Sequence, residues 1–582
     1  MYRPVLDAVG GSLFLTALVA MLPLLTLFVL LGVLKMAAWK AAAVSLVISL
    51  LVAIVAYSMP VGQALMSGTE GAAFGFFPIM WIVINGIWVY NMTVVTGHFD
   101  VLRRSFAKVS DDQRIQAIIV AFCFGALLEA LAGFGTPVAI TSVMLIALGF
   151  KPVKAAVVAL VANTAPVAFG SLAVPITTLA TVTGMPEHHL AQIVGRQTPL
   201  LAIFVPMALV FIIDGWRGVR ATLPATLTVG ISFAIAQFVC ANFISTQLTD
   251  IVASLVAAAC LMLLLRVWRP AGTYVEAEEV GTLATEADTS GASRTGSANR
   301  PSPAMAAATV GLPEKPVVPV GDTALGLAER DRLSHDTRSD VFKAYAPYLI
   351  IITVFSIAQI PFIKDALAAP TVSFKWPGLD LQSASGKPSA IPTFKFNFLA
   401  AAGTLLVLSG LITIPFIGIS VTKAFKACIG TYIQLKFAIV TVMAVLGLAY
   451  VMNASGQTAT LGKWMAGAGA AFALISPLLG WLGVAVTGSD TSSNSLFGAL
   501  QVSAAKQIGI NPFLMAASNS SGGVLGKMVS PQNLAIAAAA VGMSGKEGII
   551  FRKVLGWSLG FVFFMCVIVY LQSTSVLSWM LP

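Results

Sequence analysis

The chain has 582 residues, of which 58% are hydrophobic and only 10% are charged, whereas an average soluble domain has about 25% charged residues. This composition excludes a soluble enzyme or a nucleic-acid-binding domain and predicts a protein with many membrane spans. The net charge of +10 agrees with this interpretation, because lysine and arginine accumulate in the cytoplasmic loops of membrane proteins.

Apolar segments begin close to the N-terminus. Residues 11–34, 41–59 and 71–97 are each long enough to cross a bilayer, which takes roughly 20 apolar residues. We therefore expect three transmembrane helices here. Glu70 stands at the edge of the third segment and is interpreted as an ordinary boundary charge.

Residues 115–150 predict a re-entrant hairpin. Basic residues flank both ends of this segment, and both ends are expected on the cytoplasmic side for that reason. Glycines in residues 132–137 permit a tight turn at the tip, and a proline stops the helix there. A broken helix over residues 153–183 follows, and the first repeat is expected to span residues 1–217.

The middle of the chain changes character twice. Residues 218–269 predict two connecting transmembrane helices. Residues 270–340 are poor in large apolar side chains and contain 11 of the 24 acidic residues. Such a segment buries too little surface to offset its chain entropy, so we expect a disordered acidic loop. Arg266 and Arg269 end the preceding span and favour a cytoplasmic location for the loop.

The second half repeats the order of the first. Apolar segments at residues 344–362, 398–419 and 437–455 precede a second predicted hairpin over residues 466–508 and a second broken helix over residues 512–541. By the distribution of basic residues, matched spans run in opposite directions. The expected fold is an all-α polytopic membrane protein, an inverted-topology repeat transporter with about twelve transmembrane helices and two re-entrant hairpins. The second repeat covers residues 341–582.

The two broken helices share a pattern of polar and helix-breaking residues. Irregular backbone at membrane depth is tolerated only where it is buried in protein or lines a cavity, and paired breaks in corresponding halves indicate the binding site of a transporter. Asparagine, glycine and proline recur at the same spacing in both halves, at Asn163, Gly170 and Pro175 and again at Asn519, Gly526 and Pro531.

These breaks predict a site for a small carboxylate. Half-helix N-termini and exposed amides bind anions, and polar side chains add donors. The alternative is tight helix packing through small residues, as in ordinary membrane bundles. Lys527 is either the cationic partner of the substrate or an ion-pair partner of a residue such as Asp490. The expected substrate-binding residues are Thr136, Asn163, Thr164, Asn519, Ser520, Ser521 and Lys527.

Two carboxylates at the hairpin tips are candidates for proton coupling. Glu129 precedes the first tip by one helical turn, and Asp490 lies in the polar run 487–494 at the second tip. A carboxylate at membrane depth is costly and is by default a functional hypothesis. For Glu129 the alternative is a hydrogen-bonded structural role. For Asp490 the alternatives are coordination of a cation and capping of a half-helix.

Four motifs together resemble the bacterial L-lactate permease family: residues 85–91, 128–137, 161–170 and 517–533. The resemblance covers nearly the whole chain except the acidic loop. It implies proton-coupled uptake of lactate and glycolate across the cell inner membrane, and kinship with inverted-repeat transporters that have two hairpins. The expected partners are a carboxylate substrate, protons and the lipid bilayer, with no nucleic acid and no cofactor.

Several alternatives stay open. Hairpin carbonyls with asparagine and serine oxygens would also suit sodium, so a sodium-coupled carboxylate transporter is the alternative function. A channel would need polar residues along a continuous pore, whereas polarity here is confined to the breaks and tips. No phosphate-binding loop or nucleophile motif supports an ATP-driven pump or an enzyme. The oligomeric state is not determined, with a homodimer as one option.

Overall fold

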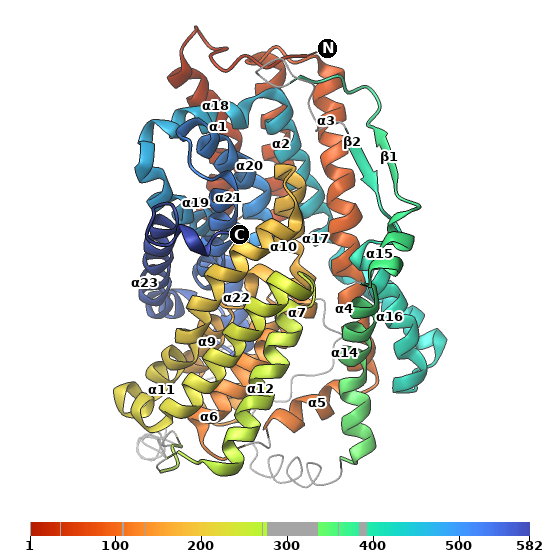
Figure 1. The fold of residues 1–582 in the computed structure, drawn as a ribbon, viewed down its shortest axis with the longest axis vertical. Coiled ribbons are helices and arrows are strands. Elements are labelled where there is room, and N and C mark those ends of the chain that lie inside the picture. Colours follow the sequence, from red (N-terminus) through yellow and green to blue (C-terminus); the bar gives the residue numbers. More distant parts are fainter. Residues whose placement is uncertain are drawn as a thin grey trace, which may run out of the picture.

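A computed structural model describes residues 2–34, 36–107, 110–133, 135–270, 272–275, 336–358, 360–382 and 393–582. The predicted disorder of the acidic loop falls almost wholly on residues outside these ranges. Within them the chain is a bundle of helices with one small sheet (Figure 1). Ten of the described helices are long and apolar enough to cross a membrane, or eleven if one bent pair counts as a single span. The expected all-α polytopic membrane protein is confirmed.

The first spans are helices with local changes of winding. The bounds are α1 (Leu13–Phe28), α2 (Ala38–Val55), α3 (Val61–Phe74) and α4 (Trp81–Val95), with π-helical turns at Val29–Val33 and Gly75–Met80. Helix α3 packs closely on α17 (Val421–Ser455), because Gly71 presents no side chain to the Leu446 carbonyl. Such close approach through glycine is the usual way for helices to associate in membranes.

The first predicted hairpin is built from short helices. After α5 (His98–Ala107), the chain forms α6 (Gln113–Ala117), a π-helical turn (Ile118–Phe124) and α7 (Gly125–Ala132), and then reverses into α8 (Thr136–Ala147). Helix α8 packs back against α7 and the π-helical turn. The broken helix follows as α9 (Pro152–Ala162) and α10 (Gly170–Thr183), with a 3-10 turn at Val167–Phe169.

Helix α11 (Glu187–Val239) covers 53 residues. A straight helix of this length would extend about 80 Å, far beyond the roughly 30 Å hydrocarbon core. Non-helical backbone at Asp214 and Gly215 divides it into two legs. The legs pack against each other where Gly230 faces the backbone of Ile203. A π-helical turn (Cys240–Ile244) and α12 (Thr249–Val267) complete this region.

The second half carries a feature that the sequence pattern did not predict. Between α14 (Arg338–Ala358) with α15 (Pro361–Ala368) and α16 (Ala402–Ile417), strands β1 (Val372–Lys375) and β2 (Thr393–Phe396) form an antiparallel pair in which Val372 faces Phe396. The sheet lies along one edge of the bundle beside α3 (Figure 1). The Trp376 indole N–H donates to the Thr69 hydroxyl at 3.1 Å, which fixes the sheet to α3.

The rest of the second half parallels the first hairpin and broken helix. After α17 come α18 (Gln457–Met465), a 3-10 segment (Ala466–Ala471), α19 (Phe472–Thr487), α20 (Asp490–Ile508), α21 (Pro512–Gly526), a 3-10 turn (Lys527–Val529), α22 (Pro531–Ala540), α23 (Glu547–Gln572) and a last 3-10 turn (Ser578–Met580). Helices α19 and α20 pack together and both contact α21. The division into repeats and the re-entrant placement of the hairpins stay predictions.

Candidate substrate site

The tip of the first hairpin depends on two glycines. Gly133 and Gly135 have φ values of +30° and +84°, a region that side chains disfavour. A Cβ atom at Gly133 would overlap the Ser171 hydroxyl, and one at Gly135 would overlap Ile536. The tip therefore fits tightly against the first break and against α22. Glu129 lies on α7 one turn before this tip.

The first break is an abrupt bend. The segments Pro152–Ala162 and Val167–Thr183 make an angle of 65°. Beyond the bend, Ser171, Leu172 and Ala173 have φ values of 46°, 54° and 61°. Left-handed backbone costs about 1–2 kcal/mol per non-glycine residue, so three in succession form a strained left-handed turn. All three residues are buried.

The second break lies later in its helix than the repeated pattern predicted. Helix α21 stays helical from Pro512 through Gly526, so Asn519 is inside a helix, whereas Asn163 is the C-terminal cap of α9. The expected matched position of the two asparagines at the breaks is therefore wrong for Asn519. The actual break is the 3-10 turn Lys527–Val529, after which the Ser530 hydroxyl caps α22.

Glu129 and Lys527 form a buried ion pair between the two halves of the chain. Glu129 Oε1 accepts from Lys527 Nζ at 2.6 Å, and the two residues are 3% and 5% exposed. Glu129 Oε2 accepts from Asn163 Nδ2 at 3.0 Å. Of the two roles expected for Lys527, this conformation shows the ion pair, but its partner is Glu129 and not Asp490.

Asp490 lies at the N-terminus of α20 within a separate polar network. Its Oδ2 accepts from the Ser520 hydroxyl at 2.5 Å and from Asn494 Nδ2 at 3.4 Å. Its Oδ1 is buried and has no hydrogen-bond partner among the described residues. The helix cap itself is Ser489, whose hydroxyl accepts from the Ser492 amide. Capping is therefore done by the neighbouring serine.

The side chain of Asn519 forms hydrogen bonds with residues of the second half. Its Nδ2 donates to Asn494 Oδ1 at 2.9 Å and to the Ser493 hydroxyl at 3.4 Å, while its Oδ1 accepts from Gln501 Nε2 at 3.0 Å. Asn494 also donates to the Pro175 carbonyl at 3.1 Å. Each hairpin thus reaches the break of the other half, through Glu129 to Lys527 and through Asn494 to Pro175.

A cavity of about 100 Å³ opens beside these groups. A single water needs roughly 10–15 Å³ on such a measure, so the cavity has room for several waters or one small organic acid. Both breaks and the second hairpin tip contribute to its wall, and so do α2 and α17. Its lining residues are Ala38, Glu129, Val167, Gly170, Ser171, Val174, Pro175, Ala438, Thr441, Val442, Thr487, Gly488, Ser489, Asp490, Thr491, Ser492, Lys527 and Gln532.

The cavity separates the predicted site residues into two groups. Glu129, Asp490 and Lys527 are among the residues that line it. The other six are not among its lining residues, and their direct contact with a substrate stays a prediction: Thr136, Asn163, Thr164, Asn519, Ser520 and Ser521. Of these, Asn163 Oδ1 and the Ser521 hydroxyl are buried without a hydrogen-bond partner among the described residues.

Sequence reasoning missed several hydroxyl groups that line the cavity. Three of them, Thr487, Ser489 and Thr491, lie in the polar run of the second hairpin tip. The sequence indicated that this run is polar, but it did not indicate which of its residues would line a cavity. Ser171 and Thr441 had no such signal, because an isolated hydroxyl in an apolar helix is common. The contributions of α2 and α17 follow only from the packing.

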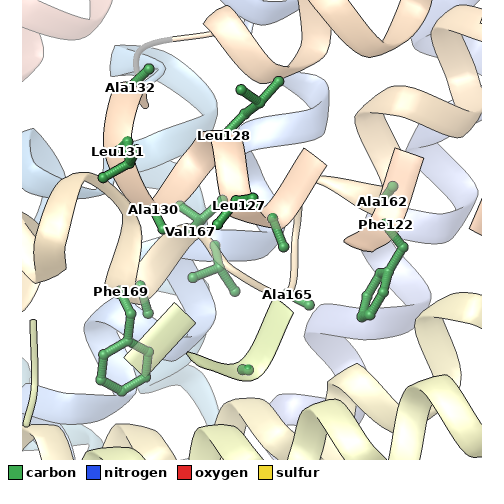
Figure 2. Close-up of a cluster of buried hydrophobic side chains, with 14 of the residues drawn as sticks. Phe122, Leu127, Leu128, Ala130, Leu131, Ala132, Ala162, Ala165, Val167 and Phe169 are labelled. Carbon is green, nitrogen blue, oxygen red and sulfur yellow. The ribbon is translucent and has the colours of Figure 1, made fainter. Parts of the chain in front are cut away.

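Helix α7 and the first break also contribute a cluster of buried apolar side chains. Figure 2 shows Leu127, Leu128 and Leu131 of α7 beside Val167 and Phe169 of the break. These side chains are all at most 3% exposed. An unpaired charge in such an apolar environment is costly. The net charge of the site should therefore stay the same when a substrate binds or leaves.

The chain is similar over almost its full length to known permeases. The sequence model of a family described as L-lactate permease matches residues 16–576. An L-lactate permease of Bacillus subtilis (strain 168) is 38% identical, with 99% of this chain and 98% of that protein covered. The glycolate permease GlcA of Escherichia coli (strain K12) is 40% identical, with 98% and 97% covered, and an L-lactate permease of the same strain is 39% identical, with 98% of both covered.

Similarity to solved structures is weaker. The efflux pump MtrF of Neisseria gonorrhoeae aligns over 87% of this chain and 83% of its own, with 11% identity and a TM-score of 0.44. The YdaH transporter of Alcanivorax borkumensis aligns over 86% of both chains, with 13% identity and a TM-score of 0.43.

Proposed function

Because the chain belongs to the L-lactate permease family, we propose that it imports L-lactate, and also glycolate, with a proton across the bacterial inner membrane. The observation that carries this proposal is the buried ion pair between Glu129 and Lys527 at the wall of the cavity. Among the described residues that line the cavity, Lys527 is the one with a positive charge, and it is already neutralised.

The ion pair provides a physical basis for coupling. A substrate carboxylate needs a cationic partner in this enclosed site, and Lys527 supplies one only after Glu129 releases it. Glu129 can do so at low cost if it takes up a proton, since the protonated carboxyl carries no charge and still accepts from Asn163. Substrate anion and proton then enter together, and the net charge of the site does not change.

The cost of the uncoupled alternative is large. If a substrate anion displaced an ionised Glu129 from Lys527, one buried carboxylate would lose its partner. Breaking a buried ion pair in this way costs about 3–5 kcal/mol, or two to four orders of magnitude in affinity. The same argument disfavours binding of the anion in addition to the intact pair, because two carboxylates would then share one cation.

Hydroxyl groups in the cavity suit a 2-hydroxy acid. Ser171 comes from the first break, and Thr487, Ser489 and Thr491 come from the second hairpin tip. A hydroxyl side chain offers one donor and two acceptor positions, which matches the substrate hydroxyl beside its carboxylate. Lactate and glycolate share this pair of groups and differ by one methyl group, so one cavity can accept both.

Uptake into proteoliposomes tests the proposal. We expect an inward proton gradient, in sodium-free buffer and with the membrane potential clamped at zero, to drive accumulation of labelled L-lactate above equilibrium. Unlabelled glycolate should compete, whereas acetate, which lacks the hydroxyl group, should compete poorly. Accumulation that requires an inward sodium gradient and ignores the proton gradient would support the sodium-coupled alternative and contradict the proposal.

A further inference from the structure

We infer that Gln532 recognises the 2-hydroxyl group of the substrate from the rim of the cavity. This inference rests on the proposed function and deepens it, because it names a residue that distinguishes a 2-hydroxy acid from a simple carboxylic acid. Gln532 is the second residue of α22 and lines the cavity. It was not among the site residues predicted from the sequence.

The residues that line the cavity differ in exposure, which gives the cavity a floor and a rim. Glu129, Asp490 and Lys527 are at most 5% exposed and belong to the floor. The half-buried and exposed lining residues form the rim: Ala38, Ala438, Thr441, Thr487, Gly488, Ser489 and Gln532. Most of these have small side chains, so the long side chain of Gln532 is prominent on the rim. A substrate held by Lys527 on the floor would therefore have Gln532 on its open side.

The backbone that carries Gln532 is fixed between the tips of the two hairpins. The next residue, Asn533, donates from Nδ2 to the Gly488 carbonyl at the second tip, at 3.3 Å. One turn further along α22, Ile536 packs so closely on the first tip that a Cβ atom at Gly135 would overlap it. Gln532 thus extends from a fixed base that contacts both hairpins.

The side chain of Gln532 lies over the tip of the second hairpin. A Cβ atom at Gly488 would be 2.6 Å from Gln532 Oε1 and 3.1 Å from Gln532 Cβ, so the absence of a side chain at Gly488 makes room for this arrangement. Gln532 is exposed, and no hydrogen bond joins its carboxamide to another described residue. The carboxamide is therefore available to a bound molecule.

The other polar side chains of the rim already have partners within their own helices. The hydroxyl groups of Thr441 and Thr487 each donate to a backbone carbonyl one turn earlier, at 2.7 Å. The Ser489 hydroxyl accepts from a backbone amide as the cap of α20. A glutamine carboxamide has two N–H donors and an acceptor oxygen, and Gln532 uses none of them on the described residues.

A carboxamide suits the 2-hydroxyl group of the substrate. The hydroxyl can donate to Gln532 Oε1 or accept from Nε2, and neither contact changes the net charge of the site. Acetate has the same carboxylate as glycolate but lacks the hydroxyl group, so it can bind Lys527 but gains nothing from Gln532. One hydrogen bond between neutral groups corresponds to roughly two- to tenfold in affinity, which is the discrimination that we assign to Gln532.

The test measures how glycolate and acetate inhibit lactate exchange in proteoliposomes of the full chain. The vesicles contain unlabelled L-lactate at the same pH as the medium, and entry of labelled L-lactate is followed. The variant Gln532→Leu keeps a side chain of similar length but cannot form hydrogen bonds. We expect its inhibition constant for glycolate to rise roughly two- to tenfold, while that for acetate stays unchanged. A wild-type ratio of the two constants in Gln532→Leu would overturn the inference, and so would an equal rise in both.

Two controls complete the test. Gln507→Leu changes another exposed glutamine, at the end of α20 and outside the cavity, and should keep the wild-type ratio. If Gln532→Leu does not reach the membrane, Gln532→Ala is measured in the same way and decides by the same ratio. Exchange needs no proton gradient. A wild-type protein that exchanges lactate but ignores a proton gradient would therefore contradict the proposed coupling, while the ratio still decides the role of Gln532.

Discussion

Lys527 can neutralise one carboxylate at a time, and this constraint links proton and substrate in the proposed cycle. In the structure its partner is Glu129, at 2.6 Å, and the substrate carboxylate would take the same place. Asp490 also lines the cavity, and Ser520 and Asn494 donate hydrogen bonds to its Oδ2. The site therefore contains one exchangeable carboxylate partner and one that is fixed by its neighbours.

Replacing Glu129 by glutamine should uncouple transport. Glutamine carries no charge, so Lys527 is available to the substrate without a proton. We expect Glu129→Gln to lose accumulation of lactate driven by a proton gradient while it retains exchange across the membrane. Radiolabelled uptake and exchange in proteoliposomes, at matched protein abundance, measure both effects.

The result that would contradict this role is uphill accumulation at the wild-type level in Glu129→Gln. A matched control is Glu547→Gln. Glu547 lies in the first turn of α23, outside the cavity, and this variant should accumulate lactate normally.

Gly170 should tolerate no side chain. A Cβ atom there would lie 2.7 Å from Glu129 Oε1 and 3.1 Å from its Cγ, so Gly170→Ala pushes the carboxylate away from Lys527. Overpacking of this kind costs about 1–3 kcal/mol, and we expect transport to fall by about tenfold or more at near-normal abundance. Gly556→Ala is the control, because a Cβ atom at Gly556 in α23 meets nothing within 4 Å. Equal lactate uptake by both variants would show that the position of Glu129 is not critical.

Sequence alone could identify the charged residues of the site but not their pairing. Glu129, Asp490 and Lys527 stand out because ionisable groups are rare in apolar segments. Which carboxylate meets Lys527 depends on how the two halves pack, and no local pattern contains that information. The burial of Glu70 was likewise not predictable from the local sequence. The sequence predicted a boundary charge, but its side chain is fully buried, and both carboxyl oxygens lack a hydrogen-bond partner among the described residues.

At the scale of helices, the second hairpin is assembled on glycine contacts. Gly480 of α19 faces the Asn519 backbone, and Gly522 and Gly526 of α21 face the backbone of α19. A Cβ atom at Gly522 would lie 2.6 Å from Pro477 Cα and 2.7 Å from its carbonyl carbon. Because these neighbours are backbone atoms, they cannot move aside as a flexible side chain would.

We therefore expect Gly522→Ala to separate α19 from α21. The protein should lose thermal stability in detergent and reach the membrane in smaller amounts. A fluorescence-detected thermal shift on the purified protein, with Gly560→Ala of α23 as the matched control, measures this. An unchanged melting temperature in Gly522→Ala would mean that the two helices are not packed as closely as described.

The sequence predicted the existence of the breaks better than their form. Glycine, proline and asparagine in apolar helices located both broken helices to within a few residues. The left-handed turn at Ser171, Leu172 and Ala173 was not predictable, because none of these residues favours that conformation and only the surrounding packing imposes it. The helical continuation of α21 through Asn519 was missed for a related reason: a buried hydrogen-bond network supports a polar residue that local propensity places at a helix end.

At the scale of the molecule, the ends of the acidic loop are fixed to different helices. Before it, the buried Arg114 pairs with Asp112 at 2.7 Å and with Asp214 at 3.0 Å and donates to the Gly272 carbonyl. After it, Asp336 pairs with Arg104 of α5 at 2.7 Å. These contacts hold the flanks in place without the residues between them.

Deletion of residues 282–329 should consequently leave lactate transport unchanged. The deleted segment is poor in large apolar side chains, and a shorter connection changes the entropy of chain closure only slightly. Both anchored flanks remain in the shortened protein. Uptake assays on membranes with matched protein abundance test this expectation. Normal abundance without lactate uptake would show that the loop takes part in transport or in its regulation.

The most direct test of the account is a count of the protons taken up when lactate binds to the purified protein. Titration calorimetry near pH 7 in two buffers with different ionisation enthalpies gives this number. We predict one proton per lactate for the wild-type protein and none for Glu129→Gln, because the substrate replaces Glu129 on Lys527. Binding of lactate to the wild-type protein without proton uptake would contradict the exchange of carboxylates on which the proposed mechanism depends.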